Sequence, residues 1–116
     1  MPVVPVQIVP LVVAPGTPRE IEDILDVADA ANGHYMSNNG LPILVVRNDG
    51  VGSINVTVSA HYSQNGLALA DLVVAVDAGE LKFIGPFTAK TFNSSSGNID
   101  IALSDDSDVF IGAIRA

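Results

Sequence analysis

The sequence predicts a mainly β fold: a single sandwich or jelly-roll-like domain of about seven strands, with an extended proline-rich N-terminal arm and one short helix. Three observations support this prediction. Apolar and polar residues alternate with the period of two that is typical of half-buried strands. Turn residues recur at intervals of roughly ten residues, as in sandwiches and jelly rolls. The N-terminal segment, in contrast, is uncharged and rich in proline and aliphatic residues. A length of 116 residues allows one domain.

Residues 1–16 are expected to form the arm, and residues 17–116 the β domain. Five prolines in the first 18 residues exclude a continuous helix, because each proline removes a hydrogen bond and clashes with the preceding turn. Disordered tails are usually polar, so this apolar segment is expected to lie on a protein surface. It either adds an edge strand to its own domain or reaches a neighbouring subunit by strand addition. Its candidate contacts with an assembly partner are Val3, Val4, Val6, Ile8, Val9, Leu11, Val12 and Val13.

A short helix is expected over about 18–31. Thr17, Pro18 and Glu20 form a T-x-x-E capping box with proline at the first helical position. Apolar residues then recur at helical spacing, at Ile21, Ile24, Leu25 and Ala28. The pair Asn32-Gly33 ends the segment, since both residues tolerate left-handed backbone angles. Part of 26–31 could be extended instead.

From residue 41 onward the pattern predicts strands. The expected strands lie at 41–47, 54–60, 67–76, 81–84, 87–92, 99–103 and 109–115. The clearest is the segment 54–60, in which Ile54, Val56 and Val58 alternate with polar residues. Turn-forming residues separate the strands, at 48–50, 64–66, 77–80, 94–97 and 104–108.

Charge and composition exclude several classes of function. The net charge is −8, and the five Lys and Arg residues are scattered, so no cationic patch is available for nucleic acid or for an anionic membrane. A signal peptide requires a basic segment before its apolar stretch, and the apolar N-terminal segment has none. We therefore expect no nucleic-acid partner, no membrane partner and a protein that is soluble when made. Charged residues make up 16% of the chain, against roughly 25% in soluble domains, which indicates a surface buried against a partner.

No pattern of catalytic residues emerges. His34 is expected in a loop and His61 at a strand end, and no nucleophile elbow accompanies them. The run Asp105–Asp108 is the best metal candidate, but it lacks the spacing of a calcium loop and is typical of a solvated hairpin turn. The carboxylates of Glu22, Asp26 and Asp29 fit the polar face of the expected helix. The sequence therefore predicts no enzyme, no cofactor and no metal site.

The second half of the chain carries a recognisable pattern. It comprises the segment 71–80, the step Ile84-Gly85-Pro86-Phe87, the pair Phe92-Asn93, the segment 97–104 and the closing segment 109–115. Over about 39–115 this pattern resembles the head decoration, or cement, proteins of tailed bacteriophages, small β proteins encoded beside the major capsid protein. The arm and the expected helix fall outside the pattern.

This resemblance implies a structural protein without catalysis that sits on the outer surface of a phage head. The expected partners are the major capsid protein and two further copies of this chain in a homotrimer. The expected location is the virion, after synthesis in the host cytoplasm. Two alternatives stay open: another phage morphogenesis protein from the neck, tail or fibre base, and a carbohydrate- or cell-surface-binding β module. The low aromatic content, 5% without tryptophan, counts against a sugar-binding face.

Overall fold

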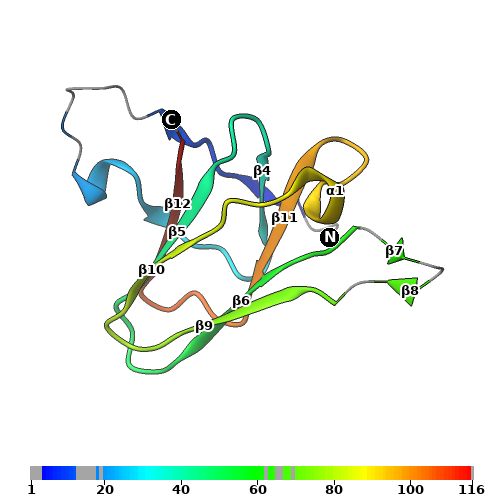
Figure 1. Cartoon of the computed structure of the whole chain (residues 1–116). Coiled ribbons are helices and arrows are strands. Elements are labelled where there is room, and N and C mark those ends of the chain that lie inside the picture. The colour runs from blue at the N-terminus through cyan, green and yellow to red at the C-terminus, as the bar shows by residue number, and fades with distance from the viewer. Residues whose placement is uncertain are drawn as a thin grey trace.

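Two mixed sheets make up most of the molecule (Figure 1). The structure is a computed structural model, and it describes residues 4–12, 18, 20–61, 63–64, 67–68 and 70–115. The first sheet has the order β1 (Val6–Gln7), β4 (His34–Ser37), β11 (Asn98–Leu103), β6 (Ile54–Val58) and β9 (Leu72–Val76). The second has the order β10 (Leu81–Ile84), β5 (Ile43–Asn48), β12 (Val109–Arg115) and β2 (Leu11–Val12), and β3 (Asp26–Val27) also pairs with β12. A hairpin of β7 (Ser63–Gln64) and β8 (Leu67–Ala68) forms a small third sheet.

The two larger sheets share one hydrophobic core, to which β6, β11 and β12 contribute alternate residues. On β6, Ile54, Val56 and Val58 are buried, while Asn55 is exposed. The same alternation buries Ile99, Ile101 and Leu103 on β11 and Val109, Ile111 and Ala113 on β12. The mainly β class is thus confirmed, and so are the strands expected at 81–84 and 109–115. Aliphatic side chains of this size give the core its stability, at about 1.5–3 kcal/mol for each one fully buried.

The helix expected over 18–31 is wrong. The segment forms a single 3₁₀ turn, η1 (Ile21–Asp23), and then extends as β3. There, Val27 and Asp26 pair antiparallel with Phe110 and Ile111 of β12. The edge of β12 offers these residues backbone partners, and the β-branched Val27 favours an extended backbone. The proposed cap Thr17 lies outside the described residues.

The turn at η1 covers the outer face of the second sheet. Gly112 of β12 lies in register with Val45 of β5, and Val45 is fully buried although it points away from the shared core. A Cβ atom on Gly112 would collide with the carbonyl group of Ile24. Glycine is therefore required here so that the Ile24 backbone can approach the sheet closely.

Two further expectations are corrected. The segment 87–92 is not a strand but contains the short helix α1 (Ala89–Phe92), which follows an extended Thr88. Conversely, residues 34–37 form β4, where the sequence predicts a loop around His34. The described residues form twelve strands, of which seven have four or more residues. The seven expected strands include one segment, 87–92, that is not a strand, and they leave out β4 and several two-residue strands. The strand expected over 67–76 corresponds to β8 and β9, and residues 70 and 71 belong to neither.

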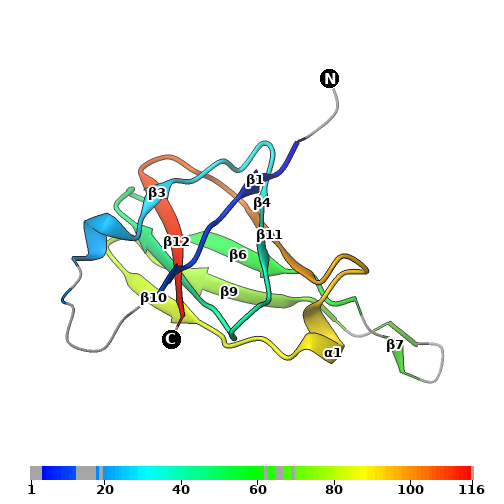
Figure 2. The same ribbon diagram turned by 90° about the horizontal axis from the view of Figure 1, so that it is seen from above.

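The described part of the arm lies on the edges of both larger sheets of its own domain. β1 pairs parallel with β4, and β2 pairs parallel with β12. Figure 2 shows this blue segment passing from its place beside β4 to β12. Pro5 precedes β1, and Pro10 separates β1 from β2. Because proline has no N–H to donate to a ladder, each of these strands is short. Within the described residues, no helix has the length and hydropathy needed to cross a membrane.

Candidate assembly surface

The structure describes six of the eight arm residues singled out by the sequence, and their exposure differs. Val4, Val6, Val9 and Val12 are exposed, and Leu11 is half-buried. Ile8 is 7% exposed and belongs to the core cluster. Val3 and Val13 lie outside the described residues. The arm is therefore attached to its own domain by Ile8 and presents valine side chains to the surroundings.

Backbone hydrogen bonds attach β1 to β4 on either side of His34. The Val6 N–H donates to the Gly33 carbonyl oxygen at 2.9 Å, and the Ile8 N–H donates to the Tyr35 carbonyl oxygen at 2.8 Å. These bonds fix the register in which Val6 lies opposite His34. The side chain of Ile8 lies in the core cluster together with Met36 of β4, whereas that of Val9 faces the other side, because successive residues of an extended segment face opposite sides.

His34 adds a side-chain contact to this attachment. Its Nδ1 lies 3.2 Å from the Val6 carbonyl oxygen, and its Nε2 lies 2.9 Å from the Asp29 backbone nitrogen. The Asp29 N–H can only donate, so Nε2 accepts and Nδ1 carries the proton that is donated to Val6. The imidazole is therefore neutral in this arrangement. Sequence reasoning missed this role, since nothing in the neighbouring residues indicates that a distant backbone segment lies against His34.

The surroundings of His34 favour its neutral form. The side chain is buried, and this burial lowers the pKa of His34 below its ordinary value of 6.5. The hydrogen bond to Val6 and the nearby Asp29 carboxylate oppose this shift but are smaller effects. The pKa of Asp29 itself is lowered from 3.8, chiefly because Asn32 donates hydrogen bonds to its carboxylate from both its side chain and its backbone.

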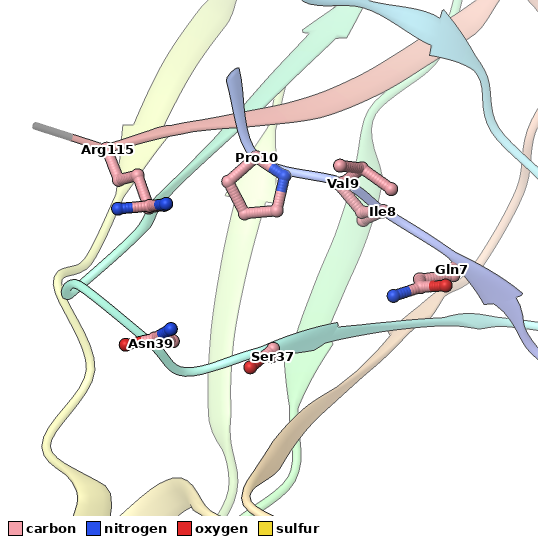
Figure 3. A pocket seen from close by; sticks show the side chains of 7 residues that line it. All are labelled: Gln7, Ile8, Val9, Pro10, Ser37, Asn39 and Arg115. Carbon is pink, nitrogen blue, oxygen red and sulfur yellow. The ribbon is translucent and has the colours of Figure 1, made fainter. Parts of the chain in front are cut away.

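A shallow cavity of about 200 Å³ runs between the arm and the ends of β4 and β12 (Figure 3). Arm residues 7–10 form one wall, and Ser37, Asn39 and Arg115 form the other. A second cavity, of about 190 Å³, lies beside Pro5 and Gly33. Small-molecule sites commonly enclose about 300–1,000 Å³, so both cavities are smaller than a typical ligand site.

Other exposed apolar side chains lie on the edge strands β9 and β10. Val73 projects from β9 and Phe83 from β10, each with more than half of its side chain exposed. The two strands belong to different sheets, and the Lys82 Nζ donates to the Ala75 carbonyl oxygen at 2.7 Å across the gap. The described molecule thus exposes apolar side chains both along the arm and along this edge.

Several other residues considered as candidate sites have structural partners. The His61 Nε2 lies 2.9 Å from the Asp100 Oδ2 at the surface. Asp105 accepts hydrogen bonds from the Asp106 and Ser107 backbone within its own turn, and the Asp106 Oδ2 accepts from the Ala30 N–H at 2.8 Å. Among the residues that the structure describes, no group of three His, Cys, Asp or Glu side chains is arranged to hold a metal ion.

Three residues of the sequence pattern, Phe87, Phe92 and Asn93, form a packed cluster with Asn38. The rings of Phe87 and Phe92 meet edge to face at a centroid distance of 5.4 Å. The Asn38 Nδ2 donates to the Phe87 carbonyl oxygen at 3.1 Å and to the Asn93 Oδ1 at 2.6 Å. These residues connect the end of β4 with the segment around α1, so they act in the fold. Comparison with known proteins gave no match to a family model, a curated protein or a solved structure.

Proposed function

We propose that the chain is a structural protein of a bacteriophage particle, a decoration protein that binds the outer surface of the head and stabilises the shell. Its two sheets would form a sandwich of the jelly-roll type, and its arm would contribute contacts to the shell. The resemblance over about 39–115 suggests this role. The partner would be the major capsid protein, and the protein would act in the virion.

The observation that carries the proposal is the arrangement of the arm. Ile8 is buried in the core, whereas the neighbouring Val9 is 76% exposed and Val4 is 69% exposed. Each valine side chain that a partner buries would contribute about 1.5 kcal/mol. An apolar segment that is attached to its domain yet presents aliphatic side chains to the surroundings fits a protein that is buried in an assembly.

A homotrimer fits the same properties. The net charge of −8 keeps free subunits apart and soluble, so self-association must rest on apolar contacts. The exposed apolar side chains of β9 and β10 offer such contacts away from the arm. Three linked subunits would bind a shell with an avidity well above that of one subunit. Weak contacts at each arm then suffice for stable decoration.

The test compares binding to undecorated shells that are assembled from the major capsid protein of the same phage. The double variant Val4→Ser/Val9→Ser should lower the apparent affinity about tenfold or more, because two apolar contacts are lost. Val51→Ser is the matched control, since Val51 is fully exposed in a turn outside the arm. Equal binding of wild type and the double variant would contradict the role of the arm, and no binding by wild type would contradict the proposed function.

The protein composition of purified phage particles distinguishes a decoration protein from the other morphogenesis proteins. A decoration protein is present in numbers comparable to those of the shell protein, whereas a neck, tail or fibre-base component is present in few copies. The mass of the isolated protein gives the oligomeric state, and a strict monomer at high concentration would contradict the trimer.

A further inference from the structure

We infer that His34 is a pH-sensitive anchor of the N-terminal arm, which holds β1 on β4 when its imidazole is neutral and weakens this attachment when the imidazole is protonated. The inference concerns the arm on its own domain. It goes beyond the proposed function and does not depend on it.

His34 occupies a buried position between the arm and the loop before β4. Its ring connects two segments that lie far apart in the sequence, the arm at Val6 and the loop before β4 at Asp29. Only 3% of the residue is exposed, although His34 lines the shallow cavity beside Pro5 and Gly33, so both contacts are largely shielded from bulk water. Within the described part of the arm, the Val6 carbonyl oxygen accepts a hydrogen bond from the His34 side chain. The imidazole is therefore part of the arm's attachment.

Protonation of His34 changes its contact with the Asp29 backbone. A protonated Nε2 becomes a donor and then faces the Asp29 N–H, which is also a donor. The contact changes from attraction to repulsion, and the charged ring would remain in a site with little access to water. The ring can relieve both effects by turning toward solvent, and this movement breaks its hydrogen bond to Val6.

Charged groups lie near His34 on several of the elements around it. The described part of the arm that packs on β4 has no charged residue from position 4 to 12. The charged groups on the other neighbouring elements are carboxylates: Asp29 in the preceding loop, Asp100 on β11, which is paired with His61, and Asp106, which is bonded to Ala30. Asp29 attracts a protonated His34, but its carboxylate already accepts two hydrogen bonds from Asn32. Burial remains the larger effect and keeps the pKa of His34 below 6.5.

The attachment that would weaken is small. β1 has two residues, which pair with His34 and Tyr35 of β4, and the Val6 and Ile8 amides donate to the Gly33 and Tyr35 carbonyl oxygens. Loss of the His34 contact removes a side-chain hydrogen bond from this short pairing. Ile8 would keep the arm near the core until its own burial is overcome. Acidification is expected to raise the fraction of molecules in which β1 is detached and available to another protein surface.

The test is amide hydrogen exchange of the full chain at about pH 7.5 and about pH 5, with rates corrected for intrinsic exchange. The probes are the Val6 and Ile8 amides, and the reference is the Ser104 amide, which donates to Asn55 between β11 and β6. The protection of the arm amides should fall about fivefold or more at the lower pH, while that of Ser104 changes little. In His34→Gln the arm protection should be nearly independent of pH, and His61→Gln should behave as wild type.

Two outcomes would overturn the inference: unchanged protection of Val6 and Ile8 in wild type, or the same acid-induced loss in His34→Gln. If His34→Gln does not fold, the nitrogen-15 spectrum of the wild-type imidazole decides the question. The inference requires the tautomer with the proton on Nδ1 at about pH 7.5 and a titration that coincides with the loss of arm protection. A proton on Nε2, or a titration separate from arm exchange, would contradict it.

Discussion

Ile8→Ala tests whether the arm contributes to the stability of the domain. Ile8 is buried among core residues from both sheets, and truncation of a buried isoleucine to alanine costs about 2–5 kcal/mol. The arm is held by strands of two residues each, so it can move inward and partly fill the cavity. We therefore expect the lower end of this range, about 2 kcal/mol. For a domain of this size, this loss lowers Tm by about 8 °C.

The assay is urea unfolding followed by circular dichroism, with Val9→Ala as the matched control. Val9 is the next residue of the same arm, but its side chain is exposed, so its truncation should change the free energy of unfolding by no more than about 0.5 kcal/mol. Hydrogen exchange of the Ile8 amide shows whether the loss is local or affects the whole domain. If the two variants differ by less than about 0.5 kcal/mol, Ile8 does not anchor the arm and the reasoning is refuted.

Three further predictions concern the domain itself. Gly112→Ala should lower the free energy of unfolding in urea by about 2 kcal/mol or more, because the new Cβ atom would collide with the Ile24 backbone. Gly52→Ala is the control and should be nearly neutral, because nothing lies within 4 Å of a Cβ atom at position 52. Phe87→Ala should cost about 3–5 kcal/mol of stability by the same assay, because Phe87 is 1% exposed. Phe83→Ala should cost little, because Phe83 is exposed. Equal losses would show that the aromatic cluster does not stabilise the fold. The neutral His34 contributes stability that is fully present above pH 6.5 and is lost as the pH falls toward the lowered pKa of His34 in the folded state. The urea midpoint of the wild type should therefore fall over this pH range. If the midpoint of His34→Gln falls in the same way, another group is responsible.

The sequence predicts strands well where local pattern and burial agree. Residues 81–84 and 109–115 are bounded by turn residues and rich in β-branched or aromatic side chains, and both strands are found as expected. β4 was missed because its four residues mix polar and apolar types, and its pairing partners are β1 and β11, which are distant in the chain. The helical spacing at 21–28 did not produce a helix, because residues 26 and 27 pair with β12 instead. This pairing is a tertiary interaction that the local sequence pattern does not predict.

The candidate surface was predictable as a segment but not residue by residue. Prolines and aliphatic residues mark the arm, yet Ile8 and Val9 are equivalent by composition. Only the register of β1 against β4 decides that Ile8 faces the core. The contact between His34 and Val6 depends on the same register, so it could not be inferred before the arm was placed.

The copy number of this chain in purified phage particles tests the proposed decoration role most directly. Quantitative mass spectrometry of the intact virion gives the ratio of this chain to the major capsid protein. We predict that this chain is present in numbers comparable to those of the major capsid protein. We also predict that it is accessible on the outer surface of the head. Absence from the particle, or presence in only a few copies, would contradict the decoration role.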